Sequence, residues 1–216
     1  MLLKSETDYL TAHGAPETSG FDQGLPEEEE VWREFKKGSK LAYSRIYRRY
    51  VNVLYNYGFK FIRDKSLVED CIQDLFVELW ESKARLSDTC SIKFYLMKAL
   101  RIKIFRALKK QGPSGKIDPL LSYDFHITSS YEDELVRLQL HQEQNEKIKH
   151  AFSKLPVRQK EAVFLRYFDS LSFEEVAGVM AINPQSVHNL IHKALKALRE
   201  HLVLEFTLLI LVNPFP

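Results

Sequence analysis

The feature that most constrains the fold is a pair of short helical segments joined by a tight turn, over residues 172–198. Ser172 and Glu175 have the S-x-x-E spacing of a capping box, which predicts a helix that runs to about Met180. After a short connection, Asn183 and Pro184 provide an N-cap and a first-turn proline for a second helix. This arrangement predicts a helix-turn-helix.

The second helix of this pair has two distinct faces. Its apolar residues recur at helical spacing and predict the buried side: Val187, Leu190, Ile191, Ala194, Leu195 and Leu198. The other side carries hydrogen-bonding or cationic groups and no carboxylate: Gln185, Ser186, His188, Asn189, His192, Lys193 and Lys196. In a helix-turn-helix, the first residues of such a helix reach base edges, and later cations contact phosphates. A plain helical hairpin with a solvated face is the alternative, and the coincidence of cap, turn, proline and divided faces favours DNA binding.

Composition limits the size of the hydrophobic core, the source of any affinity for nucleic acid and the cellular compartment. A chain of 216 residues with 45% hydrophobic residues can bury one or two modest cores. The formal net charge is +2, so any affinity for nucleic acid has to come from local patches. The two cysteines, Cys71 and Cys90, form no C-x-x-C pair, which fits the reducing cytoplasm better than a disulfide scaffold. The N-terminus has no basic start followed by an apolar run, so no signal peptide is expected.

Periodicity predicts an all-α fold with two small helical domains joined by a flexible linker, the second of them containing the helix-turn-helix. Residues 1–26 lack periodicity and are expected to form a disordered extension. The first domain, residues 27–110, is expected to hold four helices: from the acidic run 27–30 to Phe35, from the Ser39 cap to about Ile62, over 66–82 and over 91–110.

The remainder of the chain divides by composition. Residues 111–130 are rich in glycine, proline and serine and predict the linker. The second domain is expected over 131–201, followed by an apolar tail over 202–216. The apolar run of this tail is shorter than the ~20 residues that cross a bilayer and contains Glu205, so no membrane insertion is expected. We expect it to extend the last helix and to pack against protein, either in its own chain or in an inhibitory partner, because an exposed apolar patch invites aggregation.

The third predicted helix combines an apolar stripe with an acidic face. The stripe consists of Val68, Cys71, Ile72, Leu75, Phe76 and Leu79. The opposite face consists of Glu69, Asp70, Gln73, Asp74, Glu78 and Glu81. Carboxylates repel phosphates, so this face is not a DNA contact. It is either an ordinary solvated face or a surface for a protein partner.

The fourth predicted helix has the opposite charge. It carries seven cations and no carboxylate: Lys93, Lys98, Arg101, Lys103, Arg106, Lys109 and Lys110. Phe94, Tyr95 and Phe105 lie among them. Cations interleaved with aromatic rings suit a single-stranded backbone with unstacked bases. We expect Phe94 and Phe105 to belong to the core, whereas Tyr95 fits either interpretation.

Both halves of the chain resemble the extracytoplasmic-function sigma factors of bacterial RNA polymerase, in the same order along the sequence. The resemblance covers roughly residues 27–110 and 131–201. It lies in the segments Phe35–Tyr50, Asp64–Glu81, Ser91–Arg101, Leu155–Phe168, Leu171–Ala177 and Ser186–Glu200. The second of these has the form E-D-x-x-Q-x-x-F-x-x-L-W of the helix that binds the polymerase core.

The resemblance implies three binding sites. The core polymerase site comprises Gln73 and Asp74 with Asp70 and Glu78 in support. The site for the −10 promoter element comprises Lys93, Tyr95, Lys98, Arg101, Lys103 and Arg106. The site for the −35 element comprises Gln185, Ser186, His188, Asn189, His192 and Lys193.

Three positions depart from the family pattern. Arg101 is followed by Ile102 and later by Arg106, where the family has Arg-Asn and then Asp, so the −10 preference is expected to differ. Ala181 replaces the usual turn glycine, which a slightly altered turn can accommodate. His188 replaces an arginine or lysine, which weakens phosphate attraction and makes binding mildly sensitive to pH.

The expected function is that of a cytoplasmic initiation factor that catalyses no reaction and uses binding energy to trap unstacked bases. Its expected partners are the RNA polymerase core, promoter DNA and an anti-sigma factor. No cofactor and no metal are expected: His188 and His192 have a metal-binding spacing, but no third ligand accompanies them.

Two alternatives remain open from the residues alone: a two-domain DNA-binding regulator that does not enter the polymerase, and a protein-binding helical adaptor. Co-purification with core polymerase separates the initiation factor from both, and binding to promoter duplex separates the regulator from the adaptor.

Overall fold

The computed structural model describes residues 28–89, 91–111, 125 and 150–212, with Gln111 and residues 202–212 described for the backbone only. Every regular element in these ranges is a helix, which confirms the all-α prediction. The predicted N-terminal extension, nearly all of the predicted linker and the beginning of the predicted second domain lie outside the described residues.

The first helical unit contains α1 (Glu28–Lys36), α2 (Lys40–Gly58), α3 (Lys65–Ser82), the short 3-10 helix η2 (Lys83–Arg85) and α4 (Ile92–Gln111). Helix α2 begins at a polar cap, as predicted: the Ser39 hydroxyl accepts a hydrogen bond from the Ala42 amide at 3.2 Å. Asp64 caps α3 in the same way. The prediction that α2 reaches Ile62 is wrong, because the chain turns after Gly58 and the Phe61 amide bonds back to the Gly58 carbonyl.

The second helical unit contains α7 (Val157–Val163), the π-helical turn η3 (Phe164–Phe168), α8 (Phe173–Met180) and α9 (Pro184–Val212). The predicted capping box is present: the Ser172 hydroxyl accepts from the Glu175 amide at 3.1 Å, and the Glu175 carboxylate accepts from the Ser172 amide at 2.8 Å. The Asn183 side chain accepts from the Ser186 amide at 2.7 Å, which confirms the predicted start of the second helix of the pair.

Helix α9 continues through the apolar tail. It runs to Val212, which confirms that the tail extends the last helix. The side chains that would show its packing lie outside those described. Among the described residues, no helix has the length and apolar character needed to cross a membrane.

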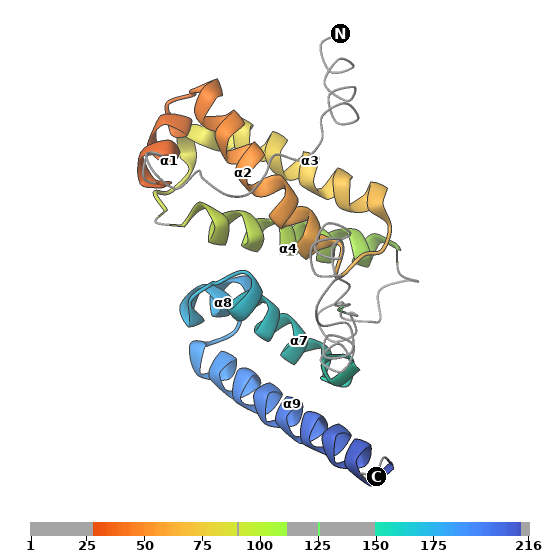
Figure 1. Cartoon of the computed structure of the whole chain (residues 1–216). Helices are drawn as coiled ribbons and strands as arrows, with labels where there is room; N and C mark the ends of the chain where they lie inside the picture. Colours follow the sequence, from red (N-terminus) through yellow and green to blue (C-terminus); the bar gives the residue numbers. More distant parts are fainter. Residues whose placement is uncertain (1–27, 90, 112–124, 126–149, 213–216) are drawn as a thin grey trace.

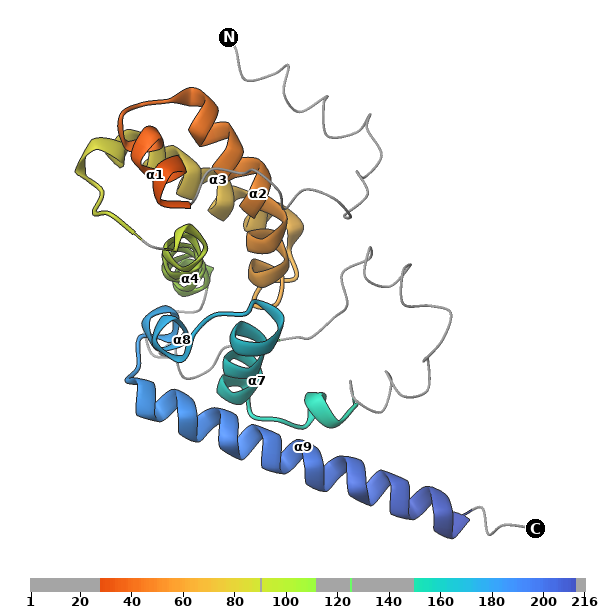
Figure 2. The same cartoon turned by 60° about the vertical axis from the view of Figure 1, so that its left-hand side comes forward.

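The two units lie against each other in successive layers (Figure 1). Helix α4 lies between α2 and α3 on one side and α8 on the other, α7 lies below the end of α2, and α9 forms the outermost layer (Figure 2). This arrangement places the predicted basic helix at the contact between the units.

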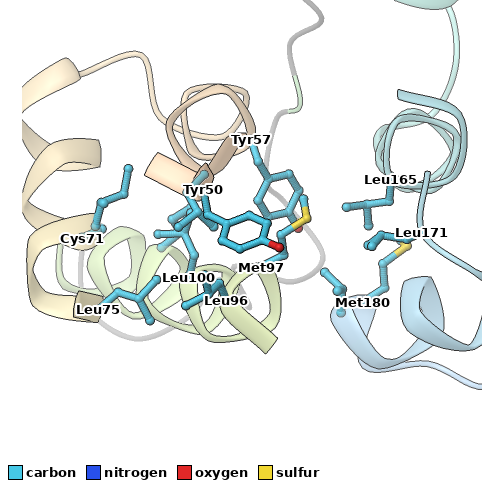
Figure 3. Close-up of a cluster of buried hydrophobic side chains, with 14 of the residues drawn as sticks. Tyr50, Tyr57, Cys71, Leu75, Leu96, Met97, Leu100, Leu165, Leu171 and Met180 are labelled. Atoms are coloured by element: carbon cyan, nitrogen blue, oxygen red, sulfur yellow. The ribbon is translucent and has the colours of Figure 1, made fainter. Parts of the chain in front are cut away.

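The hydrophobic core runs through this contact without interruption. The apolar stripe predicted for α3 is buried along its whole length and packs against α4. Leu165, Leu171 and Met180 of the second unit belong to the same buried cluster as Tyr57 and Met97 of the first (Figure 3). The units therefore share one large core, and a second, smaller cluster lies within the second unit between α7, the segment before it and α9: Phe152, Leu155, Val163 and Ala194.

Candidate functional site

The acidic face of α3 is open to solvent. Asp70, Gln73, Asp74 and Glu78 are all exposed, on the side opposite the buried stripe. Val77 lies among them with 55% of its surface exposed. The Glu78 carboxylate lies 2.5 Å from the Lys103 ammonium of α4. The negative charge of this face is complementary to a basic protein surface.

The six predicted −10 residues on α4 differ in their surroundings. Lys98 and Arg106 are exposed, whereas Lys93, Tyr95 and Lys103 are half-buried and Arg101 is buried. The Tyr95 ring packs on the Trp32 ring with centroids 5.2 Å apart, and burial raises the pKa of its hydroxyl. This half-buried tyrosine therefore helps to hold α1 against α4.

Arg101 takes part in a buried ion pair with Glu161 of α7. Its Nε donates to one carboxylate oxygen at 2.7 Å and its terminal Nη2 to the other at 3.3 Å. The side chains are 5% and 0% exposed, and the Tyr57 hydroxyl also donates to Glu161 at 2.9 Å. In this arrangement Arg101 cannot contact DNA, so its predicted accessibility is wrong. The signal missed in the sequence is a carboxylate at a core position of the apolar run 161–165.

Lys93 forms a second ion pair between the units. Its ammonium lies 3.1 Å from a carboxylate oxygen of Asp169 and donates to the Asp169 carbonyl at 2.5 Å. Burial raises the pKa of the Asp169 carboxyl, and the positive charge of Lys93 opposes that shift. Two of the predicted −10 cations therefore hold carboxylates of the second unit.

Phe94 and Phe105 of α4 were predicted to belong to the core, and the structure confirms this. Phe105 is buried, and Phe94 is half-buried and packs against the shared core. Phe94 also faces α8, where a Cβ atom placed on Gly178 would lie only 2.7 Å from its ring. The glycine thus allows α8 to approach α4 more closely than any other residue would.

The polar face of α9 is accessible over its first turns. Gln185, His188, Asn189, His192 and Lys193 are exposed, and Ser186 is half-buried. The His188 ring stacks on the Phe173 ring with centroids 3.8 Å apart and an interplanar angle of 10°, which fixes the orientation of the imidazole. Leu195 was expected on the buried side but is 44% exposed, because Ile191 and Ala194 already fill the face toward the core.

The turn between α8 and α9 is left-handed. Ala181 has φ 53° and ψ 47°, and the Ile182 amide bonds to the Ala177 carbonyl at 3.0 Å. The prediction of an altered turn is wrong: the chain keeps the conformation that favours glycine, and alanine adopts it.

No group of three or more metal-ligating side chains comes together in the part of the chain that the structure describes. The described surface presents an acidic face on α3, exposed cations on α4 and a polar face without carboxylates over the first turns of α9.

Two family models match the chain, one in each helical unit. Sigma-70 region 2 matches residues 46–113, and Sigma-70, region 4 matches residues 145–198. Among relatives, the ECF RNA polymerase sigma factor SigX of Bacillus subtilis (strain 168) is 25% identical over 168 residues, which cover 76% of this chain and 84% of SigX.

Solved structures share the fold. CnrH in complex with the cytosolic domain of CnrY superposes with a TM-score of 0.55 at 17% identity, covering 81% of this chain and 96% of that one. The sigma factor RpoE of Bartonella quintana, in complex with the anti-sigma factor NepR, gives 0.53 at 18% identity, covering 74% and 96%.

Proposed function

This chain belongs to the extracytoplasmic-function sigma factors and directs RNA polymerase to promoters, and we propose that separate surfaces of its two helical units divide this work. The first unit, residues 27–110, binds the polymerase core and the −10 element. The second, residues 131–201, binds the −35 element, and residues 111–130 connect them. The observation that carries this division is the contrast between the acidic exposed face of α3 and the polar face of α9, which has no carboxylate in its first turns.

The polymerase surface in this proposal is the exposed face of α3. Gln73 and Asp74 make the central contacts, with Asp70 and Glu78 beside them. All four side chains are exposed and none belongs to the buried stripe, so they are available to a partner without any change in the core. Their negative charge excludes DNA as that partner and suits a basic protein surface.

The promoter surfaces are the first turns of α9 and the basic side of α4. On α9, Gln185, Ser186, His188 and Asn189 are placed to read −35 base edges, with His192 and Lys193 one turn later for phosphates or neighbouring bases. On α4, Lys98 and Arg106 are exposed as the structure stands.

The remaining four −10 residues on α4 need a change in their surroundings. Lys93, Tyr95, Arg101 and Lys103 are half-buried or buried in the present arrangement. We assign them to the −10 site because of their positions along α4, the same helix that carries Lys98 and Arg106.

The initiation step in this proposal involves no catalysis by the chain itself. Unstacked bases of the −10 strand are held by aromatic and cationic side chains, and the binding energy keeps the strands apart. The protein works in the cytoplasm with its polymerase. RpoE was solved in complex with the anti-sigma factor NepR, and CnrH in complex with the cytosolic domain of CnrY. We propose that this chain also has an anti-sigma partner.

The polymerase surface is tested by capture of core enzyme and by run-off transcription. Asp74→Lys combined with Gln73→Ala should weaken capture of the core while the fold is kept, because a reversed charge at a complementary interface repels its partner. Glu34→Lys is the matched control: it makes the same kind of charge reversal at an exposed residue of α1. Equal capture by all three proteins would remove α3 from the interface.

Capture of core polymerase, together with binding of the chain to promoter duplex, separates the alternative functions. A chain that binds promoter duplex but never captures core polymerase would be a DNA-binding regulator. A chain that does neither would be a protein-binding adaptor.

A further inference from the structure

An aromatic ring outside α9 holds one of the proposed −35 residues in a fixed orientation. The imidazole of His188 lies on the ring of Phe173, the first residue of α8, with centroids 3.8 Å apart and ring planes 10° from parallel. We propose that Phe173 is a positioning residue for promoter reading: it holds the edge of the His188 imidazole toward the major groove, where one N–H donates to a guanine of the −35 element. This inference rests on the proposed function of α9.

The stack covers a face of the imidazole and leaves its edge open. A centroid distance of 3.8 Å between nearly parallel rings leaves little lateral offset, so Phe173 covers one face of the His188 ring. Both ring nitrogens lie in the plane of the imidazole, and His188 is exposed. No hydrogen bond within the described part of the chain uses either nitrogen. A neutral imidazole carries one N–H donor, which is therefore available to a base.

The ring of Phe173 is held in place by its own contacts. It is half-buried and packs against the shared core. The guanidinium of Arg166 lies over this ring, 5.1 Å from its centroid, and donates to the Leu171 carbonyl at 3.0 Å. A ring with fixed neighbours restricts the imidazole that stacks on it. A side chain that is ordered before binding does not lose that freedom when it contacts DNA, and preorganisation of this kind strengthens binding.

The packing of α8 on α9 does not depend on the stack. Val187 and Ile191 of α9 are buried in the same cluster as Val176 and Ala177 of α8. These apolar residues hold the two helices together, whereas His188 is exposed. Loss of the imidazole should therefore leave the helix-turn-helix folded.

Guanine has the major-groove edge that best suits a hydrogen-bond donor. It presents two acceptors, N7 and O6, side by side, whereas adenine presents an amino group beside N7 and cytosine presents an amino group. Thymine presents one acceptor, O4, beside its methyl group. His188 lies within the first two turns of α9, the part of a recognition helix that reaches base edges.

The test measures base preference with the full chain assembled with core polymerase. The template is a promoter that depends on the chain, with its −35 region randomised and a barcode in the transcribed part that identifies each sequence. Transcript counts give the preference for each base at each position. His188→Ala removes the imidazole, Phe173→Leu removes the ring but keeps an apolar side chain, and Phe173→Tyr keeps the ring. A further variant combines His188→Ala with Phe173→Leu.

The matched control is Phe168→Leu, which makes the same change at a ring that is 56% exposed and lies outside the stack. We expect the natural chain, this control and Phe173→Tyr to prefer guanine about 5-fold or more at one base pair, as one base contact provides. His188→Ala and Phe173→Leu should lower that preference to about 2-fold or less at the same base pair. The combined variant should lose no more than His188→Ala does, because the ring acts through the imidazole.

Each other result contradicts a defined part of the inference. A guanine preference kept by Phe173→Leu and lost in His188→Ala would show that the imidazole reads the base without its platform. Loss of preference at every base pair in Phe173→Leu would mean that α9 has moved. Guanine preference kept in His188→Ala, or a preference for another base lost in it, would refute the guanine contact. This variant changes no core residue, so it tests that contact whatever Phe173→Leu does to the fold, which circular dichroism monitors. Transcription by the natural chain with no base preference in the −35 region would refute the proposed function of α9 as well.

Discussion

Replacement of Ala181 by glycine should stabilise the protein. Ala181 has φ 53° and ψ 47°, in the left-handed region that costs a residue with a Cβ atom about 1–2 kcal/mol. Glycine avoids that cost but loses about 0.4–1 kcal/mol more in unfolded-chain entropy. The Ala181 methyl group is exposed, so no burial is lost. The expected gain is about 1 kcal/mol in the free energy of unfolding.

The assay is urea unfolding of the full chain together with calorimetry. For a chain of this size, a gain of 1 kcal/mol raises Tm by about 2–4 °C. Ala197→Gly is the matched control, because Ala197 lies within the right-handed helix α9, where glycine costs about 1 kcal/mol. The two substitutions should therefore change stability in opposite directions. A loss of stability in Ala181→Gly would refute the account of this turn.

The remaining predictions concern α9. His188→Ala and Asn189→Ala should each cost about 1–3 kcal/mol at the base pair that the side chain contacts, so discrimination among −35 variants should fall. Lys193→Ala should weaken binding to all sequences and lower the salt slope by about one unit, as expected of a phosphate contact. Titration of the full chain on −35 duplexes at several salt concentrations measures both effects, and equal losses on every sequence for all three variants would mean that this helix does not read bases. Truncation after Glu200 removes the apolar segment 202–212 and should lower stability, solubility or partner binding; a truncated chain unchanged in all three would contradict a packing role for the tail.

Local interactions made much of the fold predictable from the sequence. The capping box of Ser172 and Glu175 and the Asn183 cap involve residues three apart, and the structure contains each hydrogen bond. The α3 stripe repeats at helical spacing, which directly marks a buried face. The exposed polar face of α9 follows from the same periodicity.

Contacts between distant residues were not predictable in this way. The Arg101–Glu161 pair joins residues 60 positions apart, and no local pattern links the two. Arg101 has the sequence environment of a solvated cation, because its burial depends on a helix from the other unit. Ala181 shows a second limit: tertiary packing of α8 and α9 imposes a left-handed residue whether or not the sequence supplies glycine.

The claim that this chain directs RNA polymerase to promoters is tested most directly by mapping the 5′ ends of RNA made in vitro on genomic DNA by core polymerase, with and without the chain. We predict start sites that depend on the chain and share two upstream sequence elements at a fixed spacing, near −35 and −10. The same 5′ ends with and without the chain would contradict the account.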